Sequence, residues 1–346
     1  MLKKLWILLL LLCLAAVPAL ADEIPVALSG EGDVTLTEGG TYRLTGTLTG
    51  CVTVSCGEEN VELILDSVTI TNDDGPCILL QECGDTVLRL PQGSASVLTS
   101  GTACDVLTQS PMEDADGAAI LAHCDLSIRG SGALTVNGYL RHGIQSTKDL
   151  EIRNGTLTVQ AAGQALRGRN SVTVSGGTLV LTAGGDAIHA ASAEKDGKGY
   201  VLISGGDIAI TCTGDGVQAA ADISVTGGSV SILAGGGSTA VTKTTDDGWG
   251  GGRSRGRGWD WDDWYGDTAS DDSAVSAKGL KATDSISISD GSVTVNSADD
   301  AIHAENGIVI SGGILTLATG DDGIHGGTSL SIMNGTVTVT DSYEGL

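Results

Sequence analysis

Five acidic residues fall at matched positions of successive repeats near the C-terminal end of this chain. They are Asp299, Asp300, Asp321, Asp322 and Glu344. Carboxylates held this close repel one another, and a bound cation relieves that repulsion. Calcium prefers such hard oxygen ligands, so the cluster predicts a calcium site. The alternative is a solvated acidic face that holds no metal.

Earlier repeats continue the same column with a more varied set of side chains. Asp186 and Asp215 are further candidate metal ligands, and His142 and Gln164 occupy the same column.

A second polar column follows three residues after the first. It contains Gln145, Arg167, His189, Gln218, Lys281, His303 and His325. Imidazole beside carboxylate is also a transition-metal pattern. Because the same position accepts arginine and lysine, we favour a polar surface that hydrogen-bonds sugars, with His303 and His325 as candidate contacts.

Aromatic residues are rare in this chain, yet they gather in the segment 242–277, which is rich in Asp, Gly and Ser. Indole faces stack on the apolar faces of sugar rings, and arginine pairs with carboxylates. The alternative is a low-complexity loop without a binding role. The candidate carbohydrate contacts in this segment are Trp249, Trp259, Trp261, Trp264 and Tyr265.

These columns arise from a repeat with a period of 22 residues. The pattern polar, Gly or Ala, aliphatic, polar recurs at 142, 164 and 186, and again at 278, 300, 322 and 344. The step from 186 to 215 predicts a coil with a short insertion, and the step from 215 to 278 predicts two coils plus a long loop. Equal periods stack like side chains on one another, as repeat proteins do.

Each repeat also holds two short runs of alternating aliphatic residues around a turn. Leu150 and Ile152 precede Asn154-Gly155, and Leu157 and Val159 follow it. Such alternation is typical of β-strands, and the glycine permits a sharp corner. Antiparallel hairpins are the alternative. The constant register instead predicts an all-β, right-handed parallel β-helix, a solenoid with coils of about 22 residues.

Before residue 116 the period is blurred, although strand-like runs persist. We interpret 22–115 as the N-terminal cap and first coils, and 116–346 as the regular coils interrupted at 242–277. The alternative for 22–115 is a separate small β domain. Because the chain ends at Leu346 within a repeat, we expect that further C-terminal coils are missing.

The first 21 residues have the features of a secretory signal peptide: Lys3 and Lys4, an apolar run, and Ala19-Leu20-Ala21. We therefore expect a secreted or cell-surface protein. The net charge of −25 disfavours nucleic acid and anionic membranes as partners after signal cleavage. Seven cysteines lie beyond the signal without a CxxC motif, which favours buried thiols over disulfides or a zinc site.

The ordered series of motifs resembles a family of exported β-helix proteins that bind carbohydrate, with members that bind cellulose and pectic polysaccharide and hold calcium. The resemblance spans most of the chain beyond the signal. The motifs that carry it are Ser311-Gly312-Gly313, Asp321-Asp322-Gly323-Ile324-His325, Ser342-Tyr343-Glu344-Gly345, Asp299-Asp300-Ala301-Ile302-His303, Lys278-Gly279-Leu280-Lys281 and the insertion rich in Trp, Asp and Gly.

This resemblance implies a calcium-supported, non-catalytic carbohydrate-binding protein whose partner is a polysaccharide, cellulose or polyuronate. The expected fold is also similar to that of calcium-dependent pectate lyases, which makes Lys278 a candidate base for a second hypothesis, a polysaccharide lyase. Nearby carboxylates keep a lysine protonated, so we favour a salt-bridging Lys278. A structural or adhesive surface solenoid is the third hypothesis.

Overall fold

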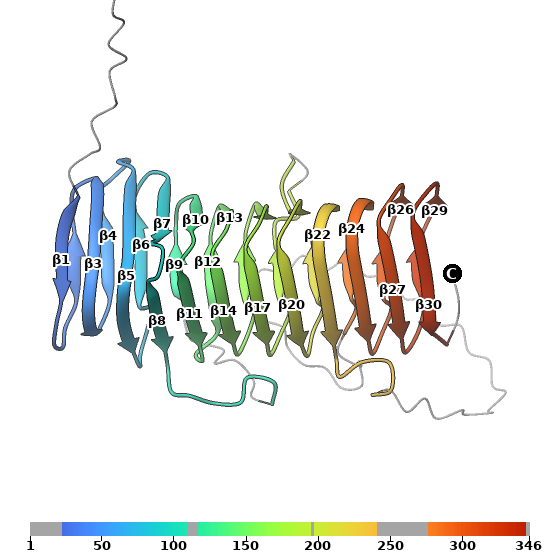
Figure 1. The fold of residues 1–346 in the computed structure, drawn as a ribbon, viewed down its shortest axis with the longest axis horizontal. Helices are drawn as coiled ribbons and strands as arrows, with labels where there is room; N and C mark the ends of the chain where they lie inside the picture. Colours follow the sequence, from blue (N-terminus) through green and yellow to red (C-terminus); the bar gives the residue numbers. More distant parts are fainter. Residues whose placement is uncertain (1–22, 109–116, 195–196, 241–275, 344–346) are drawn as a thin grey trace, which may run out of the picture.

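The computed structural model describes residues 23–108, 117–194, 197–240 and 276–343. Within these ranges the chain forms strands that lie side by side along one long axis (Figure 1). The predicted signal peptide, most of the segment 242–277 and Glu344 lie outside the described residues. No helix within these ranges has the length and apolar character to cross a membrane.

The smaller of two sheets contains one short strand from each coil, and its neighbours run parallel. Its 11 strands are β2 (Val34–Leu36), β4 (Val52–Ser55), β6 (Ile78–Glu82), β9 (Ala118–Ala122), β12 (His142–Ser146), β15 (Leu166–Gly168), β18 (Ile188–Ala190), β21 (Val217–Ala219), β23 (Leu280–Ala282), β25 (Ile302–Ala304) and β28 (Ile324–Gly326).

The larger sheet also contains only parallel pairings among its described strands. Its 19 strands are β1 (Ile24–Leu28), β3 (Gly40–Thr49), β5 (Val61–Asn72), β7 (Thr86–Leu90), β8 (Ala95–Ser100), β10 (Leu126–Gly130), β11 (Ala133–Gly138), β13 (Asp149–Ile152), β14 (Thr156–Ala161), β16 (Ser171–Val174), β17 (Thr178–Ala183), β19 (Tyr200–Ile203), β20 (Asp207–Cys212), β22 (Ile223–Ala234), β24 (Ile286–Ser297), β26 (Gly307–Ile310), β27 (Ile314–Thr319), β29 (Ser329–Ile332) and β30 (Thr336–Asp341).

Equivalent residues of successive repeats pair directly. In the smaller sheet Leu280 pairs with Ile302, and Ile302 pairs with Ile324. This parallel register is the one that the 22-residue period predicts, and it excludes antiparallel hairpins for the described strands. Aliphatic side chains consequently stack on their equivalents and form one buried cluster that extends from Leu28 to Ile324.

The fold class expected from the sequence, an open right-handed β-helix with two short strands in each coil, requires correction. A regular coil contributes three strand segments, one to the smaller sheet and two to the larger. In β22 and β24 the two segments form a single strand, and Gly228 and Gly291, at φ 85° and 92°, lie where the pairing of these strands shifts register. The larger sheet therefore wraps around the core as one continuous sheet, and the two sheets together enclose the core as a closed tube.

The long interval between Asp215 and Lys278 also differs from the sequence prediction. Val217 pairs directly with Leu280, so β21 and β23 are neighbours in the smaller sheet. In the larger sheet β22 likewise pairs with β24. The interval is therefore one coil with a long insertion, and the prediction of two coils was wrong. The interval of 63 residues did not by itself distinguish one coil from two, because the length of the insertion is not a multiple of the repeat.

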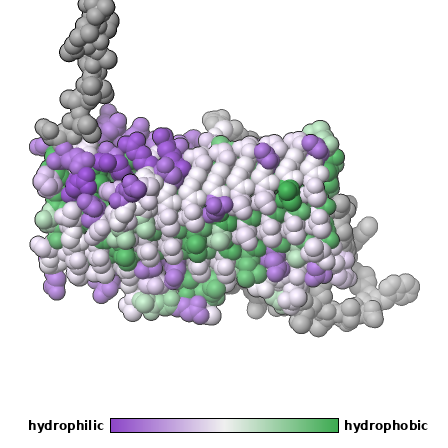
Figure 2. All heavy atoms as spheres, viewed as in Figure 1, coloured by the Kyte–Doolittle hydropathy of each residue, from purple (hydrophilic) through white to green (hydrophobic). Residues whose placement is uncertain are grey.

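Strands that precede residue 116 join the same two sheets. β7 pairs with β10, β8 with β11, and β6 with β9. Figure 2 shows hydrophilic side chains gathered over this N-terminal part of the tube. Ion pairs cross its coils, among them Arg43 with Glu23 at 2.7 Å and Arg89 with Glu62 at 2.9 Å.

The seven cysteines within the described residues are free thiols. Four of them, Cys51, Cys77, Cys124 and Cys212, are buried, and the other three are partly exposed. Burial raises the pKa of the Cys77 thiol to about 12. The expectation that buried thiols fill core positions is thus confirmed for those four.

Candidate functional site

The two polar columns of the sequence lie next to each other along the smaller sheet. We call the first the capping column, and its members lie at or just before the start of each short strand: His142, Gln164, Asp186, Asp215, Lys278, Asp300 and Asp322. We call the second the polar row, and its members lie within those strands: Gln145, Arg167, His189, Gln218, Lys281, His303 and His325. Neighbouring members of the polar row are on adjacent strands, about 4.8 Å apart.

A repeated hydrogen bond explains why the capping column is rich in acids. One side-chain acceptor in each of several coils receives the backbone N–H of the equivalent residue in the next coil. The bonds are Gln164 N to His142 Nδ1 at 3.0 Å, Asp215 N to Asp186 Oδ1 at 2.9 Å, Lys278 N to Asp215 Oδ1 at 2.8 Å and Asp322 N to Asp300 Oδ1 at 3.1 Å. His142 thus supplies through Nδ1 the acceptor that an aspartate supplies elsewhere. The repeat pattern alone did not predict this structural role.

The second oxygen of three of these aspartates faces a histidine of the polar row in the same coil, and it makes a hydrogen bond with His303 and with His325 but not with His189. The Nδ1 atoms lie 3.3 Å from Asp186 for His189, 2.7 Å from Asp300 for His303 and 2.9 Å from Asp322 for His325. The spacing of three residues between acid and histidine produces this contact. Each pair orients its imidazole and leaves Nε2 on the other side of the ring.

Lys278 lies among carboxylates, as the salt-bridge hypothesis predicts. Its Nζ binds Asp299 and lies 3.5 Å from Asp300, and the side chain is only 13 % exposed. Burial alone would lower the pKa of Lys278, but the hydrogen bond to Asp299 and the charges of Asp300 and Asp215 outweigh it and raise that pKa. A lysine in this setting remains protonated and is poorly suited to act as a base.

Asp300 is the most heavily engaged acid of the column. Burial would raise its pKa, but the hydrogen bond with His303, the charge of Lys278 and the N–H of Asp322 together lower it. The same hydrogen bond raises the pKa of His303 above its usual value, against the effect of burial. The site therefore stabilises a charged carboxylate next to cationic partners.

Three of the predicted metal ligands come together. One oxygen each from Asp299, Asp300 and Asp321 lies within 4.8 Å of the others, a spacing that suits a cation with oxygen ligands. Asp322 instead faces His325. Lys278 already neutralises part of this group.

Asp186 and Asp215 lie in earlier coils, on the other side of Lys278 from this group. Asp215 is 1 % exposed, and its carboxylate accepts hydrogen bonds from Ser276 Oγ at 2.8 Å and Lys278 N, with Lys281 Nζ 3.0 Å away. Its oxygens are satisfied by the protein itself. The structure therefore separates these two acids from the other candidate ligands.

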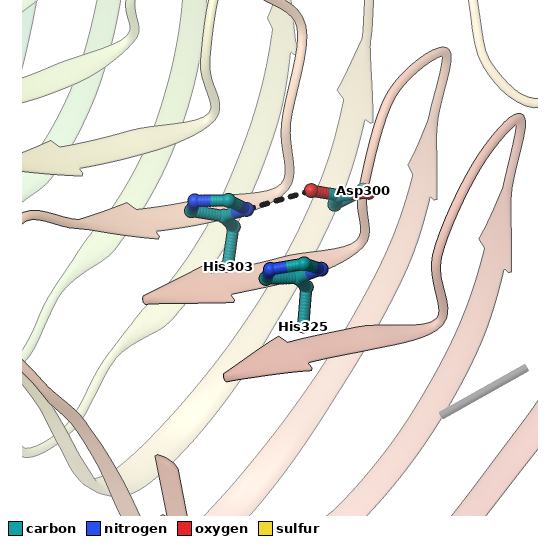
Figure 3. A group of neighbouring side chains, drawn as sticks. All are labelled: Asp300, His303 and His325. Carbon is teal, nitrogen blue, oxygen red and sulfur yellow. Dashed lines mark hydrogen bonds and ion pairs between the residues drawn. The ribbon is translucent and has the colours of Figure 1, made fainter. Parts of the chain in front are cut away.

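Of the predicted carbohydrate contacts, His303 and His325 lie in the described structure. Their rings stack with centroids 4.8 Å apart and an angle of 10° between planes (Figure 3). Trp249, Trp259, Trp261, Trp264 and Tyr265 lie outside the described residues.

Known proteins share both the sequence and this architecture. The model of the family described as "Carbohydrate-binding domain-containing protein" matches residues 30–323. The chain belongs to this family. A relative from Acetivibrio thermocellus with the same description is 34 % identical over 143 residues, which are 41 % of this chain and 49 % of the relative. The match thus spans about half the length of that relative.

A solved structure is also similar to this carbohydrate-binding-domain protein. It is the "Structure of the polysaccharide lyase-like protein from C. thermocellum, Gadolinium derivative". The identity is 32 %, the TM-score is 0.56, and the match covers 62 % of this chain and 91 % of the other.

One feature of the polar row in this carbohydrate-binding-domain protein was not singled out from the sequence. Arg167 has its Nη1 3.3 Å from Nε2 of the buried His142. Burial and the charge of Arg141 lower the pKa of Arg167. The alignment of repeats places Arg167 in the row. Only the structure shows that its guanidinium is partly buried and is affected by the positive charge of Arg141.

Proposed function

We propose that this chain binds a polysaccharide that lies along the polar row. The observation that carries the proposal is the row itself, in which seven polar side chains from Gln145 to His325 occupy adjacent strands. An extended glycan repeats its hydroxyl groups along one direction. A ladder of regularly spaced donors and acceptors matches such a ligand.

The capping column strengthens this proposal because it orients the row before a ligand arrives. Asp300 and Asp322 hold His303 and His325, and Asp215 holds Lys281. Side chains that are already fixed lose little conformational entropy on binding. Their outer polar atoms then face the glycan at little cost.

The insertion rich in tryptophan is the second element of the proposed site. The chain re-enters the described structure at Ser276, whose Oγ contacts Asp215 and accepts a hydrogen bond of 3.3 Å from Lys281 of the polar row. Ser276, at the end of the insertion, therefore lies next to the row. Indole rings there would add stacking on sugar faces.

For the glycan we propose cellulose or a polyuronate, supported by calcium. Arg167 and Lys281 supply fixed cations in the row for a uronate carboxylate. Calcium bound by Asp299, Asp300 and Asp321 would take over the neutralising role of Lys278 and add a second positive centre beside the row. The three oxygens fit this ion chemically.

The family description and the similarity to a polysaccharide lyase-like protein both support a polysaccharide as the partner. A lyase with Lys278 as base was the alternative. We do not favour it, because Lys278 is paired with two carboxylates and its pKa is raised.

A retention assay with a matched pair of glutamine variants tests the proposal. Gln218 is in the polar row and Gln160 is on β14 of the larger sheet, and both are partly exposed. We expect Gln218→Ala to weaken retention by insoluble cellulose or polygalacturonate several-fold, up to about tenfold for one lost hydrogen bond, while Gln160→Ala binds as the unmodified chain does. Equal effects of the two variants would remove the row from the binding site.

Calcium is tested separately by titration calorimetry and by retention with a chelator. We expect calcium uptake by the unmodified chain and weaker uptake by Asp321→Asn. A chelator should reduce glycan retention. Absence of calcium uptake would contradict the metal part of the proposal and leave the polar row to be judged by the glutamine variants.

A further inference from the structure

His303 and His325 are equivalent residues of the paired strands β25 and β28. Their rings are nearly parallel, with centroids 4.8 Å apart, and Figure 3 shows both projecting from the same face of the sheet. A stacked pair of imidazoles on neighbouring strands presents two equivalent nitrogens side by side.

The hydrogen bonds of the pair determine which nitrogens are presented. Nδ1 of His303 bonds Asp300 and Nδ1 of His325 bonds Asp322. A neutral imidazole that donates from Nδ1 to a carboxylate keeps the lone pair of Nε2 available. Metal-binding histidines very commonly have such a carboxylate behind the ring, which orients it and makes the outer nitrogen more basic.

We propose that His303 and His325 bind one divalent transition-metal ion, such as Zn²⁺ or Cu²⁺, through their two Nε2 atoms. This site goes beyond the proposed glycan binding. It also differs from the proposed calcium site in its ligand chemistry, because imidazole nitrogen suits transition metals and carboxylate oxygen suits calcium.

The geometry requires the two rings to rotate. Zinc–nitrogen bonds are about 2.0–2.1 Å long, so two nitrogens on one ion lie no more than about 4 Å apart. The Nε2 lone pairs lie in the ring planes and are nearly parallel in the stacked pair, so one ring must rotate toward the other before both nitrogens face one ion. The His325 side chain is 46 % exposed and has room to do so.

A further oxygen ligand is close at hand. Oε1 of Glu305 lies 3.6 Å from Nε2 of His303 and belongs to an exposed side chain. Asp300 also groups with the two histidines, with one ligand atom from each of the three residues within 4.8 Å of the others. Two imidazoles, a carboxylate and water would complete a four-coordinate site.

His189 provides a matched comparison within the same row. It has the same spacing from an aspartate, with Nδ1 3.3 Å from Asp186 but without a hydrogen bond, and its row neighbours are Arg167 and Gln218. Among the described residues, no second imidazole stacks on the ring of His189. If single Asp–His pairs bound the metal, His189 would do so as well.

Zinc titration calorimetry and electron paramagnetic resonance of the copper complex test the proposal on the full chain without an affinity tag. We expect the unmodified chain to take up one ion with two nitrogen ligands. His303→Asn and His325→Asn should each weaken uptake by about tenfold or more and leave at most one nitrogen ligand. His189→Asn should retain the full affinity and both nitrogens.

Asp322→Asn keeps both imidazoles and removes only the carboxylate behind His325. We expect weaker zinc binding with two nitrogen ligands preserved, provided that circular dichroism shows an unchanged fold. Lack of zinc uptake, an equal loss in His189→Asn, or displacement of zinc by excess calcium would each overturn the proposal. Glycan retention is measured with calcium and without zinc or copper, so its failure is distinguishable from failure of the transition-metal site.

Discussion

Oδ1 of Asp300 accepts a hydrogen bond of 3.1 Å from the backbone N–H of Asp322, the equivalent residue one coil later. The other oxygen of Asp300 binds His303 at 2.7 Å. One carboxylate thus joins two coils and orients a side chain of the polar row. A carboxylate has about four lone-pair positions, so this structural role leaves acceptor capacity for a cation.

Asp215→Ala tests the structural role of the capping column. The substitution leaves the N–H of Lys278 and the hydroxyl of Ser276 without their acceptor in a buried position. We expect a loss of about 2–4 kcal/mol in the free energy of unfolding, measured with denaturant. Asp207→Ala, at an exposed position on β20, is the control and should change little. A loss no larger than that of the control would contradict the capping role.

Lys278→Ala tests whether this lysine is a buried counterion. Its removal leaves Asp299 and the largely buried Asp300 without their cation. We expect a destabilisation of roughly 2 kcal/mol, more than an exposed ion pair contributes, together with a greater gain in stability from added calcium. Thermal unfolding with and without calcium measures both effects.

The lyase alternative requires Lys278 to act as a neutral base, whereas the counterion assignment requires it to be protonated. If the unmodified chain releases unsaturated products from polygalacturonate at alkaline pH and Lys278→Ala does not, the lysine is a base and the assignment as a counterion is wrong. The partly exposed Lys198, which pairs with Glu194, provides the control substitution Lys198→Ala.

His142 predicts a specific dependence of stability on pH. Burial, followed by the charges of Arg167 and Arg141 and of His189, holds its pKa well below the usual 6.5, so His142 is neutral in the folded chain. In the unfolded chain it takes up a proton as the pH falls through about 6.5. Because the unfolded state then binds more protons than the folded state, the free energy of unfolding decreases as the pH is lowered through this window.

His142→Asn should remove this contribution while an amide oxygen still accepts the N–H of Gln164. Between about pH 6.5 and 5.5 we expect the unmodified chain to lose about 1 kcal/mol more stability than the variant. Denaturant unfolding at the two pH values gives this difference directly. An identical loss in both proteins would show that His142 is protonated in the folded state.

Deletion of residues 246–270 tests the insertion rich in tryptophan. The strands on either side, β22 and β24, pair with each other directly, so the shortened chain should keep its circular dichroism and melting behaviour. Glycan retention should fall, because stacking surfaces are lost. Unchanged affinity would restrict the binding site to the polar row.

Much of the architecture follows from the repeat. The aliphatic residues Leu280, Ile302 and Ile324 recur every 22 positions, and a parallel stack is the arrangement in which each covers the next. The conversion of two predicted strands into one continuous strand at Gly228 was not predictable. A positive φ at glycine serves equally to end a strand or to bend it.

The sequence by itself determined the parallel register, the alignment of the capping column with the polar row, and the ion-pairing environment of Lys278. Only the tertiary structure decided how each carboxylate uses its two oxygens. Asp215 and Asp300 occupy the same position of the repeat, yet one is enclosed by Lys281 and Ser276 and the other joins a cluster with Asp299. The reason is that hydrogen bonds and charges depend on neighbours from adjacent coils, which lie at least 20 residues away in the chain and only one strand spacing away in space.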